Sequence, residues 1–231
     1  PVTGGTDIVT MSEAQEIAMA KAADQEAVAA YGRYPDARLQ AYVERLGKGL
    51  AARSERPDLP WIFKVVDDPT VNAFALPGGY IYVTRGIMAN LRSEAELVAV
   101  LGHEIGHVTG RHSASQMSKQ QLAMGGLIVG MAVEPELQRF GGLAQQALGL
   151  LFLKFGRDDE NEADELGLRY MARQDYDPRE MLEVFGVLDG VTRAEGGGAR
   201  MPDWLSTHPS PGNRTTRIQQ QIAASGVSGT L

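Results

Sequence analysis

The spacing of apolar and polar residues divides the chain into helical segments around a short region of strand character. Residues 12–31 are rich in alanine and follow a capping signal at Ser12, and residues 36–52 repeat apolar side chains at helical intervals. Three short stretches rich in β-branched and aromatic residues then predict strands, at 61–66, 74–76 and 80–84. The turn signal Pro77-Gly78-Gly79 lies between the last two strands, which are therefore expected to form a hairpin.

A buried helix is predicted from about Ser93 to about His112. Its start is a capping box, Ser93-Glu94-Ala95-Glu96, and the apolar residues that follow form a helical stripe. Residues 97–102 carry almost no polar side chain, so this helix is expected to be largely buried. Gly102 and Gly106 lower helix propensity, and their expected use is to let another element pack closely.

The second half of the chain predicts further helices, which begin near residue 158, after Asp177-Pro178 and at residue 213. Residues 195–198 predict a flexible loop and the tail after residue 225 a frayed end. The apolar stretches at 122–133 and 143–153 predict either a helical hairpin in the core or a mobile flap over a cleft. A membrane span needs about 20 apolar residues, so neither stretch predicts one.

Composition agrees with one α+β domain over residues 1–231, mainly helical, with N-terminal helices at 1–55 and a core at 60–220. The net charge is -7 and no basic cluster stands out, which argues against nucleic acid as a partner. The chain has no cysteine, so disulfides and thiol chemistry are excluded. It begins with Pro1 and shows no signal-peptide pattern, so we expect that an export signal or lipid anchor has been removed.

The candidate chemistry lies in the buried helix, where His103-Glu104-Ile105-Gly106-His107 spells the H-E-x-x-H pattern of zinc peptidases. Two histidines four residues apart lie one helical turn apart, so both rings can reach one metal ion. Glu104 lies on an adjacent face, where it can act as the base toward a water molecule. The alternative is a core helix with two structural histidines.

A catalytic zinc site needs a third protein ligand. The chain has four histidines, and His112 faces elsewhere on a continuous helix, so we interpret it as structural or exposed. A carboxylate from residues 157–167 is the best candidate for the ligand. Glu160 and Asp164 share one helical face, so Glu160 can bind the metal while Asp164 accepts the spare N–H of a ligating histidine. The alternative is a solvated acidic helix start, which is favoured for the other two glutamates, Glu162 and Glu165.

These motifs carry a family resemblance. H-E-I-G-H followed by E-N-E-A-D at 160–164 resembles the HtpX and CAAX-prenyl-protease family, metallopeptidase family forty-eight. The stretches at 72–83 and 207–211 are similar to its N-A-F-x-x-P-G-G hairpin and its T-H-P segment. The lack of a membrane span and the T-H-P-x-P segment bring the chain closest to soluble BepA-like periplasmic members. The resemblance implies a zincin-type domain with a small sheet edging the cleft, one zinc ion per chain, and Glu160 as third ligand.

Further roles follow from the resemblance. Asn72, Ala73 and Phe74 are expected to bind an extended peptide at a strand edge, or else to form an ordinary hairpin. His208 is expected either to stabilise the oxyanion as a catalytic residue or to latch the zinc. Apart from the resemblance, Arg214 and Arg217 follow on the next predicted helix, where they could pair with Asp164 or with substrate.

The expected function is that of a zinc-dependent endopeptidase acting on unfolded or misassembled proteins, in the periplasm or envelope of a bacterium. The alternative is a latent protease used mainly as a chaperone-like binding module. A purely structural metal site is a third reading, but a closed site has no need of Glu104. Expected partners are polypeptide substrates and an outer-membrane assembly or a peripheral membrane surface, while the sequence leaves the oligomeric state open.

Overall fold

The computed structural model describes residues 2–4, 7–128, 154–194, 203–208 and 213–224. These ranges hold the strands β1 (Ile62–Val66), β2 (Ala73–Leu76) and β3 (Tyr80–Thr84). The helices are α1 (Glu13–Tyr31), α2 (Ala37–Ala51), α3 (Arg85–Asn90), α4 (Glu94–Thr109), α5 (His112–Ile128), α7 (Arg157–Ala172), α8 (Glu180–Ala194), α9 (Asp203–Thr207) and α10 (Arg214–Ala224). The fold is therefore mainly helical with a small sheet, which confirms the α+β class expected from the sequence.

The sheet has the strand order β1-β3-β2. The predicted hairpin is confirmed, because β2 and β3 pair antiparallel with Ala73 opposite Val83. Gly78 and Gly79 in its turn have φ of 80° and 97°, values that side chains other than glycine rarely adopt. β1 pairs parallel with β3, and β2 is an edge strand of the sheet that the described residues form.

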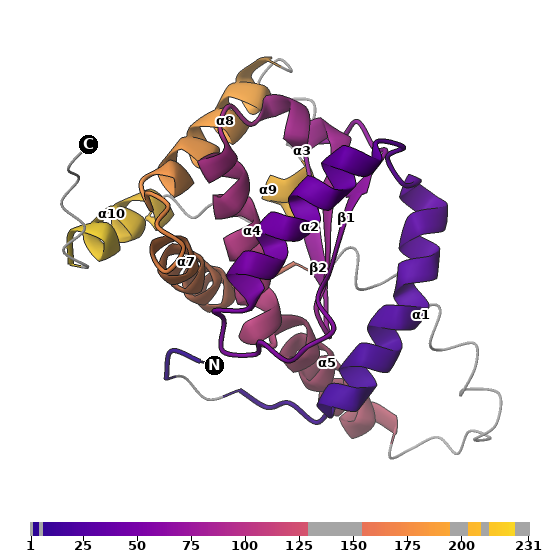
Figure 1. The fold of residues 1–231 in the computed structure, drawn as a ribbon. Helices are drawn as coiled ribbons and strands as arrows, with labels where there is room; N and C mark the ends of the chain where they lie inside the picture. Colours follow the sequence, from indigo (N-terminus) through magenta and orange to yellow (C-terminus); the bar gives the residue numbers. More distant parts are fainter. Residues whose placement is uncertain (1, 5–6, 129–153, 195–202, 209–212, 225–231) are drawn as a thin grey trace.

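The sheet lies between two helical layers (Figure 1). The side chains of Phe74, Tyr80 and Tyr82 on one face pack against α1. The alternate residues Ala73, Ala75, Ile81 and Val83 belong to the main core with α2 and α4, as the period of two along a strand requires. The helices α7, α8 and α10 lie on the far side of α4 (Figure 1), so α4 runs through the interior.

Close packing between α4 and α7 depends on two glycines of α4, as the sequence predicted. A Cβ at Gly106 would lie 2.7 Å from the carbonyl oxygen of Ala163, and one at Gly102 would lie 3.3 Å from Gly167. Residues without bulk on both helices thus bring the two backbones together. This approach sets the distance between the side chains that the two helices present to each other.

The prediction that the buried helix continues to about His112 is wrong. Helix α4 stops at Thr109, and Arg111 adopts a left-handed φ of 57° before α5 begins at His112. Part of the 122–133 stretch continues α5 to Ile128, whereas residues 129–153 lie outside the described residues, as do the 195–198 loop and the tail after 225. In the described part of the chain, every helix is too short or too polar to cross a membrane.

Candidate metal centre

The two histidines of α4 face one point in the interior. The Nε2 atoms of His103 and His107 lie 3.1 Å apart, and both side chains are buried. One turn of helix separates the residues, which is the spacing that brings both rings to the same side. The sequence expectation that the two rings converge therefore agrees with the structure.

Two further side chains reach this point from other elements. Glu160, in the first half of α7, places Oε1 3.4 Å from His107 Nε2 and Oε2 3.6 Å from His103 Nε2. His208 follows α9, and its Nδ1 lies 3.3 Å from His103 Nε2 and 2.9 Å from Glu160 Oε1. Each of the four residues offers a ligand atom within 4.8 Å of the others, so the group could hold a metal ion.

A buried carboxylate and a buried guanidinium support His103 from outside this group. Its Nδ1 lies 3.0 Å from Asp164 Oδ1, as the sequence predicted. Arg214 donates from Nε and Nη2 to the two oxygens of Asp164 at 2.8 and 2.7 Å, so of the two arginines considered it is Arg214 that makes this pair. Arg214 Nη1 also lies 2.7 Å from Glu160 Oε2. Burial would raise the pKa of Asp164, but Arg214 and His103 outweigh burial and lower it.

His107 is supported by residues whose part the sequence did not reveal. Its Nδ1 lies 2.9 Å from Nδ1 of His112, whose Nε2 lies 3.1 Å from Glu162 Oε2. Both His112 and Glu162 are buried, so the exposed interpretation of His112 and the solvated interpretation of Glu162 are wrong. Glu165, by contrast, is half-exposed and pairs with Arg169.

The candidate base Glu104 is fully buried beside these rings. The indole N–H of Trp204, on α9, donates to Glu104 Oε1 at 3.1 Å, and His208 Nε2 lies 3.5 Å from the same oxygen. Oε2 of Glu104 has no hydrogen-bond partner among the residues that the structure describes. Trp204 was not among the residues predicted from the sequence, where its only signal was its position four residues before His208.

Burial and mutual contacts shift the pKa values of three members of this group. Burial lowers the pKa of His107 well below its ordinary value, so its ring is neutral and carries a lone pair. Burial would raise the pKa of Glu160, but the three histidines outweigh it and hold the pKa well below the usual range, so this carboxyl is charged. Burial would lower the pKa of His208, but Glu160 and Glu104 outweigh it and raise it.

The donor set fits zinc, cobalt or manganese better than calcium or magnesium. Imidazole nitrogens and one carboxylate are ligands that zinc prefers, whereas calcium and magnesium prefer oxygen alone. If His103 Nδ1–H donates to Asp164, Nε2 of His103 presents a lone pair toward that of His107 at 3.1 Å. Two nitrogen atoms this close need either a proton or a metal ion between them, and the two rings are therefore placed to bind the same ion.

The residues expected at a peptide-binding edge have two orientations. Phe74 packs between Tyr31 and Tyr82 on the α1 face of the sheet, so its ring points away from α4. Ala73 lies on the α4 face. Asn72 is buried, and its Oδ1 has no hydrogen-bond partner among the described residues. Any contact of Phe74 with a peptide at this edge would thus be made by its backbone.

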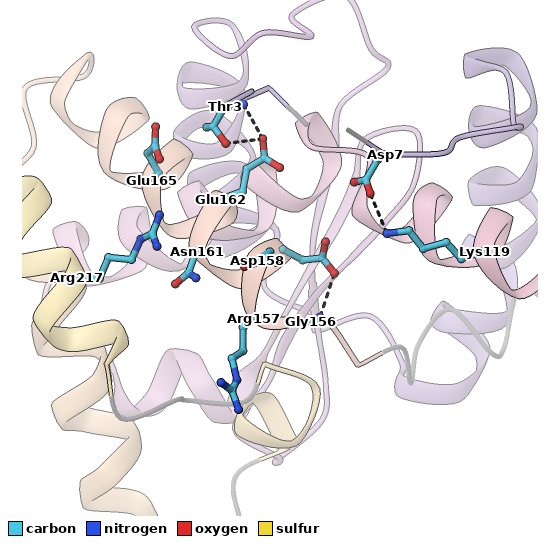
Figure 2. Close-up of a pocket in the computed structure, with 11 residues that line it drawn as sticks. Thr3, Asp7, Lys119, Gly156, Arg157, Asp158, Asn161, Glu162, Glu165 and Arg217 are labelled. Atoms are coloured by element: carbon cyan, nitrogen blue, oxygen red, sulfur yellow. Dashed lines mark hydrogen bonds and ion pairs between the residues drawn. The ribbon is translucent and has the colours of Figure 1, made fainter. Parts of the chain in front are cut away.

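Arg217 is not at the metal centre. It lines a polar cavity of about 550 Å³ on the outer side of α7, where Asn161, Glu162 and Glu165 also contribute (Figure 2). Of the two arginines on α10 that the sequence singled out, only Arg214 reaches Asp164.

Comparison with known proteins agrees with the residues gathered here. The model of Peptidase family M48 matches residues 37–222. The mitochondrial metalloendopeptidase OMA1 of Arabidopsis thaliana is 37% identical over 176 residues, which cover 75% of this chain and 34% of that protein. The OMA1 of Schizosaccharomyces pombe is 36% identical over 182 residues, which cover 78% of this chain and 52% of that protein.

Bacterial relatives carry a different name. The beta-barrel assembly-enhancing protease of Yersinia pestis is 31% identical over 225 residues, which cover 93% of this chain and 45% of that protein. The chain thus spans between about a third and about a half of the length of these relatives. The match to the family model over most of the chain confirms the expected class of enzyme, a metallopeptidase, and the chain belongs to peptidase family M48.

Proposed function

We propose that this chain is a zinc-dependent endopeptidase that hydrolyses peptide bonds in unfolded or misassembled proteins of a bacterial cell envelope. The observation that carries the proposal is the buried group of His103, His107 and Glu160 with Glu104 beside it. A purely structural zinc site would have no use for a buried carboxylate with one oxygen that lacks a hydrogen-bond partner among the described residues.

The three ligands proposed for zinc are His103, His107 and Glu160. A zinc ion held by them would act as a Lewis acid on the peptide carbonyl and increase the acidity of the attacking water. Zinc is the metal proposed because it is the ion that two histidines and one carboxylate most often bind in peptidases, although cobalt or manganese would also fit.

Glu104 is the proposed base. Trp204 occupies Oε1 of this carboxylate, which leaves Oε2 to take the proton of the water and deliver it to the leaving amine. Asp164 is proposed to hold His103 with Nδ1 protonated, so that Nε2 faces the metal.

The edge strand β2 is proposed to bind the substrate in an extended conformation. Backbone pairing makes few demands on substrate side chains, which suits unfolded polypeptides of varied sequence. The carbonyl oxygen of the Asn72 side chain, buried without a partner in the described part of the chain, supplies an acceptor for a substrate N–H. Ala73 and the backbone of Phe74 continue the proposed contact.

The names of the relatives support the proposed setting. Several bacterial relatives are called beta-barrel assembly-enhancing protease, and others are called mitochondrial metalloendopeptidase. Outer-membrane assembly in the periplasm is therefore the setting that we propose for this chain. The chain covers less than half of the bacterial relatives, so this part of the proposal concerns the catalytic region alone.

A second candidate function is that of a latent protease, and the position of His208 favours it. Its Nδ1 lies beside both His103 Nε2 and Glu160 Oε1, in the place of a fourth ligand, and the side chain is buried. A histidine in that place would exclude water from the metal until α9 moved. In the active alternative, the same ring donates a hydrogen bond to the developing oxyanion.

The test is cleavage of casein, an unfolded protein, by zinc-loaded wild type and by Glu104→Gln. Cleavage by wild type alone, with equal zinc content in both proteins, is the result expected. Cleavage by both proteins would contradict the proposal. So would a lack of cleavage by wild type together with a lack of cleavage by His208→Ala. His208→Ala separates the two candidates, since higher activity supports a latch and lower activity supports an oxyanion donor.

A further inference from the structure

The second metal-facing histidine has an unusual partner behind it. A ligating imidazole needs a hydrogen-bond partner at its outer nitrogen, which fixes the tautomer and the orientation of the ring. For His107 this partner is neither a carboxylate nor a carbonyl but the ring of His112, at 2.9 Å between the Nδ1 atoms. The two rings meet at 80° with 4.9 Å between their centroids.

The hydrogens can be assigned along this chain of residues. If Nε2 of His107 faces a metal, its Nδ1 carries the proton and donates to Nδ1 of His112. His112 then carries its own proton on Nε2, which donates to Oε2 of Glu162 at 3.1 Å. Every donor thus meets an acceptor, and Glu162 provides the negative charge at the end.

The local backbone is shaped to bring His112 back toward His107. A continuous helix would direct a side chain five residues on to another face, but α4 ends at Thr109 and Arg111 adopts a left-handed conformation. Gly110 leaves room for the returning ring, because a Cβ there would lie 2.4 Å from Nε2 of His112. The turn and the glycine together permit the contact between the two rings.

Glu162 is itself fixed from the outside. Its Oε1 accepts hydrogen bonds from the backbone N–H of Thr3 at 2.8 Å and from the Thr3 hydroxyl at 3.1 Å (Figure 2). A buried carboxylate whose two oxygens both accept hydrogen bonds is a rigid anchor for the imidazole of His112.

We propose that His112 and Glu162 are positioning residues for the metal ligand His107. Together they hold its ring with Nε2 toward the zinc ion and Nδ1 protonated, as Asp164 does for His103. The proposal rests on the proposed function for the identity of the metal. It adds that the affinity for zinc depends on two residues that do not touch the metal.

The test measures zinc affinity, by competition with a chromogenic chelator, together with the visible absorption spectrum of the cobalt-loaded protein. In His112→Leu the acceptor is lost, and we expect zinc to bind about 10- to 100-fold more weakly with an altered cobalt spectrum. In His112→Asn the amide oxygen occupies the place of Nδ1 and can still accept, so we expect a loss of no more than about threefold. This recovery by a polar residue is not expected from a role in packing alone.

The Glu162→Gln variant tests the second half of the pair. We expect zinc to bind about fivefold more weakly, because a neutral acceptor holds His112 less strongly than a charged one. Glu165→Gln is the matched control, since it makes the same change on the same helix at a half-exposed site away from the histidines. Its zinc affinity and cobalt spectrum should equal those of wild type.

Three results would overturn the proposal. One is a folded His112→Leu that binds zinc as tightly as wild type, and another is a His112→Asn that loses as much affinity as His112→Leu. If His112→Leu does not fold, equal zinc affinities of Glu162→Gln and Glu165→Gln are the overturning result. Should wild type and His208→Ala both bind zinc but leave casein intact, the endopeptidase proposal fails, while the ratios of zinc affinity still test the roles of His112 and Glu162. If wild type binds zinc no better than the double variant His103→Ala, His107→Ala, both proposals fail.

Discussion

The two metal-facing histidines of α4 are held from opposite sides by different chemistry. His103 meets the carboxylate of Asp164, which the buried guanidinium of Arg214 clamps with two hydrogen bonds. His107 meets the ring of His112, a group that can be neutral. One side is therefore a network of full charges in the interior, while the other places a full charge only at its outer end, on Glu162.

This difference shows that a metal-binding motif does not determine which residues form hydrogen bonds to its ligands. The two histidines come from one short motif, but their partners come from three other helices, α5, α7 and α10. Loss of a partner on the charged side should reduce the unfolding free energy strongly, because it leaves a buried charge unpaired. The imidazole side should tolerate substitution better as long as an acceptor remains.

The largest expected effect is on the charged side, in Arg214→Met. Arg214 is fully buried between Asp164 and Glu160, so its loss leaves Asp164 without its cationic partner and leaves Glu160 with the histidines alone. We expect the metal-free protein to lose about 3–5 kcal/mol of unfolding free energy, measured by urea denaturation. Saturating zinc should restore part of the stability, since a cation then returns. A loss below about 1 kcal/mol would mean that the two carboxyls are not both charged.

Gly106→Ala should disturb the supports of His103 and His107 alike, because it changes the packing of α4 against α7. The added Cβ would lie 2.7 Å from the Ala163 carbonyl oxygen and force α4 and α7 apart, at a cost of about 1–3 kcal/mol in unfolding free energy. Thermal and urea unfolding would measure it. The control is Gly186→Ala on α8, where a Cβ has nothing within 4 Å and should be neutral or slightly stabilising. Equal behaviour of the two variants would show that the close approach of α4 and α7 is not needed.

Asp164→Asn changes only the charged side, at the partner of His103. The amide weakens the contact with His103 and removes the charge that pairs with Arg214, so we expect zinc to bind about 10- to 100-fold more weakly. Chelator competition gives the affinity. A loss no greater than that of His112→Asn would contradict the view that the charged side is the more sensitive one.

The smallest expected effect is at the outer end of the imidazole side, in Thr3→Ala. This variant removes the hydroxyl donor to Glu162 but keeps the backbone donor. We expect zinc affinity to fall by about twofold, which corresponds to the weak end of the net contribution of a hydrogen bond. A tenfold loss of zinc affinity would indicate that Thr3 does more than donate a second hydrogen bond to Glu162.

Local signals in the sequence were sufficient for part of this architecture. The period of the apolar residues and the capping box predicted α4, and the spacing of Glu160 and Asp164 predicted that both would face the histidines. These predictions succeed because helical geometry fixes which residues share a face. The glycines of α4 likewise predicted the approach of α7.

Other features depend on contacts that no local pattern reveals. The left-handed turn at Arg111, a residue with no special preference for it, sends His112 back to His107. Trp204 reaches Glu104 from a helix of five residues, too short to show a periodic pattern. The parallel pairing of β1 with β3 joins strands that are separated in the chain by β2. In each case the tertiary fold selects the partner, and the sequence supplies only the residue type.

The proposed metal site is tested most directly by a crystal structure of the zinc-loaded protein, with anomalous scattering measured on both sides of the zinc absorption edge. We predict one peak, bonded to Nε2 of His103, Nε2 of His107 and a carboxylate oxygen of Glu160, with His112 still in contact with His107. A peak bonded to other residues, or no peak in protein saturated with zinc, would contradict it.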